Sequence, residues 1–239
     1  MDLKIKDVAE LLNVSQTTIR RWLLDGKIPA YKLNRQYRFS RIEIENWMMK
    51  QKLSFSVGKE LLPTGEEQIY PVEKQALTQP GNQQFGLYRA INRGGLFQNV
   101  KGETKEEVIC NTMSLIAEKM RLDPDVLSEL LLDRERLMPT AFNNGVAVPH
   151  ARECLQHVPF DLVSVVLPEK PIAYGALDEK PVDILFFLFA TGDKIHLHLL
   201  AKIAHLSSNE EFLTFLRSHP EKAALLESIR EWEGSLNIG

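Results

Sequence analysis

Hydrophobic residues recur at helical spacing in two short stretches near the start of the chain. They are Val8, Leu11 and Leu12 in the first stretch and Ile19, Trp22 and Leu23 in the second. Apolar residues spaced by three and four share one face of a helix. Asn13-Val14 is placed for a tight turn and Ser15 for an N-cap. The pattern therefore predicts two short helices joined by a turn, which is the helix-turn-helix arrangement.

After these helices, the pattern changes to strict alternation between residues 31 and 39. Tyr31, Leu33, Arg35, Tyr37 and Phe39 alternate with Lys32, Asn34, Gln36 and Arg38. Alternation is typical of a strand with two different faces. We expect a hairpin with a basic tip around residues 34–38, followed by a helix at 41–51 that packs through Ile42, Ile44 and Trp47.

A segment without a steady period separates this region from the rest of the chain. Residues 54–84 are rich in Gly, Pro, Gln and Glu, which is the composition of a linker. From Phe85 onward, helical and strand patterns alternate, which predicts an α/β domain with both sheet faces covered. The expected division is 1–53, a linker at 54–84, and 85–239. Helices are expected at 104–120, 123–137, 194–207, 209–218 and 221–232, and strands at 145–148, 163–167 and 182–190.

The charge of the chain is divided in the same way. The net charge is −3, but residues 1–53 contain eleven Lys and Arg against six Asp and Glu, a balance of +5 that leaves −8 for the rest. Such asymmetry suggests that one end meets a polyanion. The N-terminus lacks the apolar region of a signal peptide, and the longest apolar run, Ile184–Ala190, is too short to span a bilayer. The two cysteines have no metal-binding spacing, so we expect a cytoplasmic protein without membrane insertion, a disulfide framework or a cofactor.

The basic region resembles the winged helix-turn-helix of the excisionase and MerR type. The matching segments are Val8–Leu12, Val14–Ser15, Thr18–Trp22, Gly26–Ala30 and Arg35–Phe39. The resemblance implies a second helix in the major groove and a wing on the DNA backbone or minor groove. A solvated basic face is the alternative, and Trp22 and Trp47 are expected to be core residues. A single module is small, so specific binding suggests a homodimer. The expected DNA contacts are Gln16, Thr17, Thr18, Arg20, Arg21, Arg35 and Arg38.

In the acidic region, residues 85–239, the candidate reactive side chains are histidines. His150 follows the predicted strand at 145–148 and Pro149, so we expect Pro149 to lead the chain out of the sheet and to leave His150 at its carboxyl edge. Arg134 and Thr140 precede it. Imidazole, guanidinium and hydroxyl supply a nucleophile, a positive charge and a donor for a phosphoryl group.

A second histidine cluster lies in residues 196–206, HLHLLAKIAHL. On a helix, His196 and His198 point about 200° apart, so they do not converge on one metal. We therefore expect no metal site. His196 is expected beside His150, and the other histidines are expected to point outward.

These two blocks resemble enzyme IIA of the phosphotransferase system, in its fructose–mannitol class and especially the nitrogen-regulatory branch. The matching residues are Arg134-Glu135, Thr140, Gly145–His150 and His196–Ala204. The resemblance implies a mixed sheet flanked by helices on both faces, phosphorylation of His150 by phospho-HPr, and flanking roles for Arg134 and His196. Ala151 and Met138-Pro139 depart from the commoner residues of the family.

Three functions fit the two regions. The first is a phosphorylation sensor that controls DNA binding and transcription, in a nitrogen or a sugar pathway. The second is a phosphocarrier that passes the phosphoryl group to a sugar-permease IIB component. The third is an unphosphorylated regulator that docks partner proteins. Neither cysteine lies in a phosphate-binding loop like that of IIB, which favours regulation; the operator and target genes are not specified by the sequence.

Overall fold

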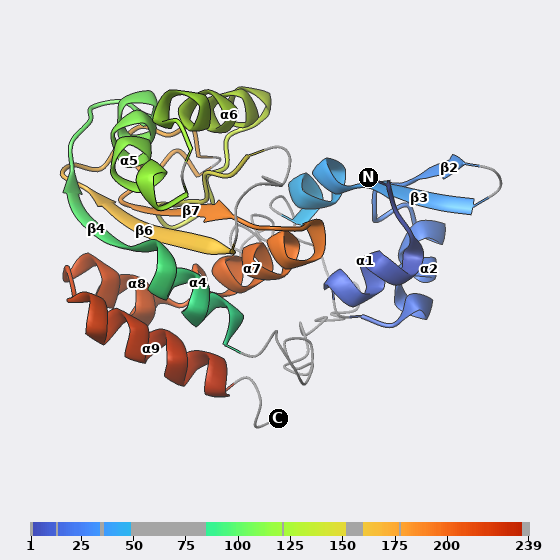
Figure 1. Ribbon diagram of the computed structural model, residues 1–239. Coiled ribbons are helices and arrows are strands. Elements are labelled where there is room, and N and C mark those ends of the chain that lie inside the picture. The colour runs from blue at the N-terminus through green and yellow to red at the C-terminus, as the bar shows by residue number, and fades with distance from the viewer. Residues whose placement is uncertain are drawn as a thin grey trace. The chain divides into compact units, whose positions relative to one another are not determined.

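The computed structural model describes residues 2–12, 14–33, 36–48, 85–120, 122–151, 160–176 and 178–235 (Figure 1). These residues belong to two compact units, one within Met1–Gln84 and the other spanning Phe85–Glu233. The predicted linker at 54–84 lies outside the described residues. In the described part of the chain, no helix has both the length and the apolar character needed to cross a membrane.

The N-terminal unit combines a small antiparallel sheet with helices. Its sheet has the strand order β1-β3-β2, in which Tyr31 pairs with Arg38 and Asp2 with Ser40. The elements are β1 Asp2–Leu3, α1 Ile5–Leu12, α2 Gln16–Leu24, β2 Tyr31–Leu33, β3 Gln36–Ser40 and a helical segment at 41–48. The predicted helix pair and hairpin strands are confirmed, and Ser15 caps α2 by accepting from the Thr18 amide at 3.1 Å.

Apolar residues from each of these elements form the core of this unit. Val8, Ile19, Phe39 and Ile44 are fully buried. Trp22 and Trp47 are only half-buried; their ring centroids lie 5.7 Å apart, and Trp47 Nε1 donates to the Lys27 carbonyl at 2.6 Å. The two tryptophans thus fasten the helical segment at 41–48 to the end of α2 rather than filling the centre of the core.

The C-terminal unit is built on a mixed four-stranded sheet. Its strand order is β4-β6-β7-β5; β6 and β7 are antiparallel, and the two outer strands pair in parallel. The strands are β4 Gly95–Val100, β5 Val146–Ala147, β6 Leu162–Pro168 and β7 Ile184–Phe189. Every residue of β6 and β7 is buried, as their largely apolar sequences predict. The mixed sheet and its covered faces are confirmed.

Six helices cover the two faces of this sheet. Helices α5 and α6 lie on one face, and α4, α7, α8 and α9 lie on the other (Figure 1). Their bounds are α4 Gly86–Gly94, α5 Lys105–Met120, α6 Pro124–Leu137, α7 Asp193–Leu206, α8 Glu210–Arg217 and α9 Lys222–Ser235. The five helices predicted between 104 and 232 are confirmed to within three residues at each end.

Local capping explains where several of these helices begin. Asp123 accepts from the amides of Asp125 and Val126, and Pro124 occupies the first turn of α6. At α5, the Glu107 amide donates to Thr104 Oγ1, as in a capping box. The Glu107 carboxylate, however, accepts from the Glu103 amide, one residue earlier than the motif predicts.

The N-terminus of α4 is capped by a side chain that lies far away in the sequence. Its N-cap residue, Phe85, makes no side-chain hydrogen bond, but the Glu233 carboxylate on α9 accepts from the amides of Leu87 at 3.1 Å and Tyr88 at 2.9 Å. Glu233 also forms an ion pair with Lys202 on α7, and both side chains are buried. One carboxylate thus joins α4, α7 and α9, and its charge is compensated by the lysine and by two backbone donors.

We predict that Glu233→Gln lowers the free energy of unfolding by about 3 kcal/mol, because it leaves the buried Lys202 charge without its counter-ion. Urea denaturation followed by circular dichroism measures this change. Glu227→Gln on the same helix is the matched control, since Glu227 pairs with Arg230 on the exposed face of α9. The control should leave the urea midpoint unchanged, and equal midpoints for both variants would contradict the prediction.

Candidate functional site

His150 is held beside β7 by backbone pairing. Val146 and Ala147 pair in parallel with Ile184 and Leu185, and the Leu188 amide then donates to the Pro149 carbonyl at 3.0 Å. His150 itself forms a parallel bridge with Leu188. The expectation that Pro149 leads the chain out of the sheet is therefore wrong. Proline lacks a backbone donor, but its carbonyl still accepts, and here the acceptor is the group that pairs with β7.

The imidazole of His150 is oriented by its own strand. Its Nδ1 lies 2.7 Å from the Val148 carbonyl oxygen. Because a carbonyl can only accept, Nδ1 carries a proton, and the neutral ring then has its lone pair on Nε2.

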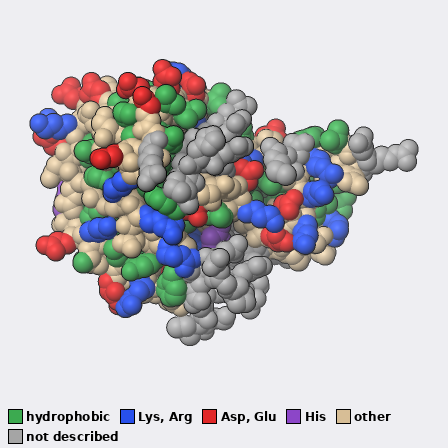
Figure 2. Space-filling view, viewed as in Figure 1, with side chains coloured by type: hydrophobic (Ala, Val, Ile, Leu, Met, Phe, Trp, Pro, Cys, Tyr) green, Lys and Arg blue, Asp and Glu red, His purple; other side chains and the backbone are tan. Residues whose placement is uncertain are grey.

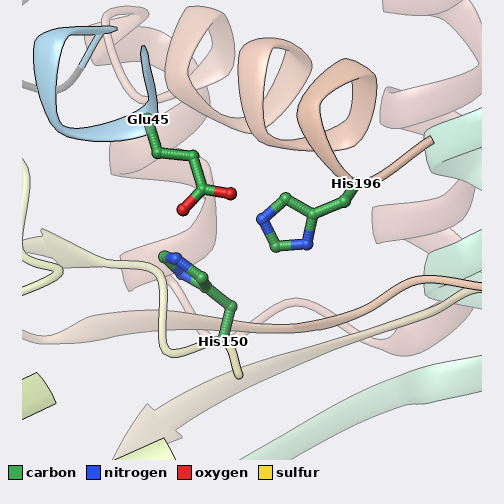
Figure 3. A group of neighbouring side chains, drawn as sticks. All are labelled: Glu45, His150 and His196. Atoms are coloured by element: carbon green, nitrogen blue, oxygen red, sulfur yellow. The ribbon is translucent and has the colours of Figure 1, made fainter. Parts of the chain in front are cut away.

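His196, in the first turn of α7, lies beside this ring. The two ring centroids are 5.0 Å apart and the planes are inclined by 64° (Figure 3). The structure thus brings together the two histidines expected to meet. His198 is half-buried, whereas His205 is exposed, and its ring centroid lies 5.6 Å from that of Trp232. His150 and His196 come from distant parts of the sequence, and their rings meet edge to face.

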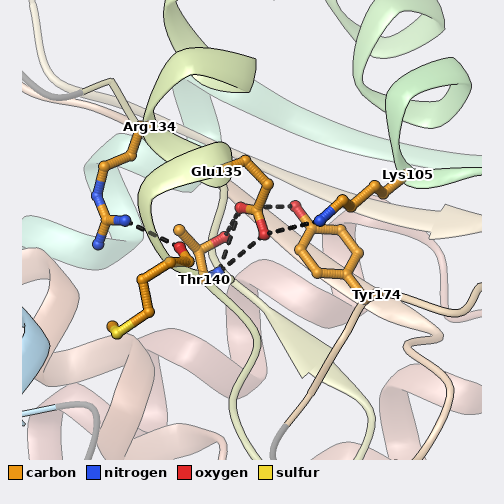
Figure 4. A network of polar contacts seen from close by, with 6 residues as sticks. Lys105, Arg134, Glu135, Thr140 and Tyr174 are labelled. Carbon is orange, nitrogen blue, oxygen red and sulfur yellow. Dashed lines mark hydrogen bonds and ion pairs between the residues drawn. The ribbon is translucent and has the colours of Figure 1, made fainter.

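The other two predicted site residues lie at the end of α6 and in the loop that follows it. Arg134 lies in the last turn of α6, and its Nη1 donates to the Met138 carbonyl at 3.0 Å (Figure 4). Thr140 differs from the expectation. Its hydroxyl donates to Glu135 Oε2 at 2.6 Å, so the same proton is not available to a phosphoryl group. Thr140 therefore stabilises the loop instead of supplying a donor.

Glu135 is the residue to which the sequence analysis gave no role. Its carboxylate is 3% exposed and accepts from both the amide and the hydroxyl of Thr140. The Tyr174 hydroxyl donates to it at 3.4 Å, and Lys105 Nζ lies 3.7 Å away (Figure 4). Burial, and then the charge of Glu135, raise the pKa of Tyr174 well above its usual value, so the phenol stays protonated and donates. Only the Arg134-Glu135 pair in the motif could have signalled this network.

The turn that begins β5 is fixed by an ion pair. Arg217 on α8 donates to both carboxylate oxygens of Asp183, at 2.7 and 3.0 Å, and its Nη2 also donates to the Asn144 carbonyl at 2.6 Å. Gly145 has a φ of +77°, and a Cβ atom there would lie 2.8 Å from Asp183 Oδ1. The Asn144-Gly145 turn is thereby held against α8 and the start of β7.

We predict that Gly145→Ala lowers the free energy of unfolding by about 2 kcal/mol, because alanine is strained at positive φ and its methyl group displaces the Asp183–Arg217 pair. Thermal and urea denaturation measure the loss. Gly86→Ala is the control, since no atom lies within 4 Å of the position of its added Cβ. If the two alanine variants are equally stable, the turn does not impose the proposed constraint.

On the N-terminal unit, the exposed face of α2 carries most of the expected DNA contacts. The exposed members are Gln16, Thr17, Arg20 and Arg21. Thr18 differs, because it is half-buried and its hydroxyl lies 3.0 Å from Ser15 Oγ in the helix cap. Figure 2 shows Lys and Arg side chains spread over the face of this unit that is in view, and acidic side chains gathered over α5 and α6 of the other unit.

The hairpin contributes one described basic residue of the expected set. Arg38 on β3 is half-buried and donates to Gln36 Oε1 at 2.9 Å and to the Tyr37 carbonyl at 3.3 Å. These bonds align its guanidinium along the strand. Arg35, the other expected contact of the hairpin, lies outside the described residues.

Comparison with family models assigns both parts of the chain. The model of the phosphoenolpyruvate-dependent sugar phosphotransferase system, EIIA 2, matches residues 90–232, which is more than half of the chain. The chain belongs to this family. A helix-turn-helix domain model matches residues 3–52, so this EIIA 2 protein carries a helix-turn-helix domain at its N-terminus.

Individual relatives agree with this assignment. The nitrogen regulatory protein of Escherichia coli is 32% identical over 152 residues, which cover 62% of this chain and 92% of the relative. That of Pseudomonas aeruginosa is 32% identical over 146 residues, covering 60% and 94%. The crystal structure of nitrogen regulatory protein IIA-Ntr from Neisseria meningitidis matches with a TM-score of 0.52 at 22% identity, over 56% of this chain and 91% of that one. This last likeness shows a shared fold.

Proposed function

We propose that this EIIA 2 protein accepts a phosphoryl group from phospho-HPr on Nε2 of His150. The observation that carries the proposal is the bond from Nδ1 to the Val148 carbonyl, which leaves Nε2 as the nucleophilic nitrogen of the neutral ring. The family supplies the reaction class. The neighbouring His196 ring, 5.0 Å away between centroids, offers a second imidazole for contact with the phosphoryl oxygens.

The transfer requires positioning more than bond-making assistance. The Nε2 lone pair of His150 attacks phosphorus, the new N–P bond forms, and the N–P bond to the donor histidine breaks. The Val148 carbonyl stabilises the positive charge that develops on the His150 ring through the Nδ1 proton. Arg134, whose charge is permanent, is proposed to balance the phosphoryl charge, and its bond to the Met138 carbonyl fixes the guanidinium at the end of α6.

We predict that the protein becomes labelled when it is incubated with phosphoenolpyruvate, enzyme I and HPr, and that the phosphate is acid-labile and maps to His150. His150→Ala should take up no label, whereas His205→Ala should be labelled like the wild type because His205 is exposed on the opposite part of α7. Label on His150→Ala overturns the site, and an unlabelled wild-type protein favours an unphosphorylated docking regulator.

We further propose that the phosphorylation state controls DNA binding by the helix-turn-helix domain. The support is the presence of both domains in one chain, the exposed basic face of α2, and the name of the relatives, which are nitrogen regulatory proteins. A phosphoryl group adds about −1.5 to −2 charges at His150. One small module reads a short site, so a homodimer on paired half-sites is part of the proposal. Transfer onward to a IIB component is the alternative fate of the phosphoryl group.

We predict that gel-shift titrations of the unmodified protein show log K falling with log salt at a slope of about −4 to −5, as for five neutralised DNA phosphates. The phosphorylated protein should bind with a different affinity at each salt concentration. Arg21→Ala on the exposed face of α2 should make the slope shallower by about 1.

Identical curves for the two phosphorylation states would contradict the proposed coupling but not DNA binding itself. A slope near zero indicates instead that the helix-turn-helix contacts protein. Thr214→Ala, an exposed uncharged position on α8, is the control that should not change the slope.

A further inference from the structure

A continuous chain of hydrogen bonds links a buried carboxylate on α6 to the imidazole of His150. At its first end, Glu135 accepts from the Thr140 amide at 3.0 and 3.2 Å and from the Thr140 hydroxyl at 2.6 Å (Figure 4). The Thr140 carbonyl in turn accepts from the Val148 amide at 2.9 Å. The Val148 carbonyl accepts from Nδ1 of His150 at 2.7 Å. Thr140 and Val148 each donate to one neighbour and accept from the other, while Glu135 only accepts and His150 only donates.

The direction of these bonds is the same throughout. Each proton points from the His150 end toward Glu135, so the negative charge of the carboxylate lies at the accepting end of the chain. At Thr140 and at Val148, the backbone amide and the carbonyl belong to different peptide groups, so these bonds act together by fixing the positions of the groups that they join. The Val148 carbonyl is thereby fixed in place as the acceptor for the Nδ1 proton of His150.

Glu135 is well anchored for such a role. Its carboxylate is 3% exposed, and Tyr174 and Lys105 also contact it. The loop that it holds also pairs directly with the strand before His150, because Ala141 bridges Ala147 and the Phe142 amide donates to the Val146 carbonyl at 2.6 Å. Movement of Thr140 would therefore be transmitted to Val148.

We propose that Glu135 is a positioning residue for His150: acting through Thr140 and Val148, it holds the imidazole in the Nδ1-protonated form and directs Nε2 toward the incoming phosphoryl group. The proposal rests on the proposed phosphorylation of His150. It requires no contact between Glu135 and the phosphoryl group. Misplacement of a reacting atom by about 1 Å can cost about a hundredfold in rate, so this indirect constraint is large enough to matter.

The test compares Glu135→Gln with Glu233→Gln in the full-length protein. Both variants remove a buried carboxylate that accepts from backbone amides and pairs with a lysine, but Glu233 belongs to the α4–α7–α9 contact and not to this chain. If Glu135 serves only folding, the two variants should change the site alike. A positioning role predicts that they differ.

Two measurements are made on each protein. Nitrogen-15 NMR of the imidazole reports the tautomer of His150, which we expect to be the Nδ1-protonated form in the wild type and Glu233→Gln, and a mixture in Glu135→Gln. Rapid-quench transfer from phospho-HPr should give a rate constant at saturating donor about tenfold lower for Glu135→Gln, with an unchanged half-saturating donor concentration. Glu233→Gln should keep the wild-type rate constant while its urea midpoint falls.

A wild-type tautomer and rate in Glu135→Gln overturn the proposal, and so does an equal loss in both variants. If Glu135→Gln does not fold, Thr140→Val is the deciding variant. It removes the hydroxyl bond to Glu135 and retains the bonds made by the Thr140 amide and carbonyl. We expect it to shift the tautomer in the same direction with a rate loss of about threefold, and no shift overturns the proposal. The tautomer is measured without donor, so failure of phosphorylation itself is recognised separately, by an unlabelled wild type.

Discussion

A strand of only two residues precedes His150, and its neighbours must supply the rigidity that so short a strand lacks. Backbone pairing with β7 holds it on one side, and the Ala141–Ala147 bridge holds it on the other. The Gly145 carbonyl accepts from two amides at the start of β7, those of Asp183 and Ile184. The position of His150 therefore depends on all of these contacts at the end of the sheet, and not on β5 alone. Charged groups on α6 and α8 reinforce it because each is tied to the loop at a backbone atom.

Most elements of the fold are evident from the sequence because their causes are local. The Asp123-Pro124 pair predicts the start of α6, and the largely apolar runs of β6 and β7 predict buried strands. The segment formed by α4 and β4 was not resolved into elements by the same reasoning. Its helix has glycine at both ends and receives its cap from Glu233, 146 residues beyond Leu87. A cap supplied from that distance leaves no sign in the sequence next to the helix.

The candidate site was predictable in its reactive groups and not in its supporting ones. His150 and His196 belong to motifs whose resemblance to enzyme IIA implies that they lie together, and their rings do meet. The assignment of Thr140 as a donor failed because a hydroxyl has one proton, and the sequence does not show that Glu135 receives it. Residues that only orient other residues can be recognised only from their three-dimensional contacts. Tyr174 and Lys105, which contact Glu135, are examples.

The range of electrostatic forces limits how a phosphoryl group on His150 can affect DNA binding. At physiological ionic strength the field of an exposed charge is screened over about 8 Å. The charge of a phosphoryl group on His150 would therefore act most strongly on groups within roughly that distance. Long-range repulsion from DNA through solvent would accordingly add little to the proposed coupling. Under the proposed coupling, the phosphoryl group would change either a direct contact of the basic domain or the association of two chains, and these two routes differ in their dependence on protein concentration.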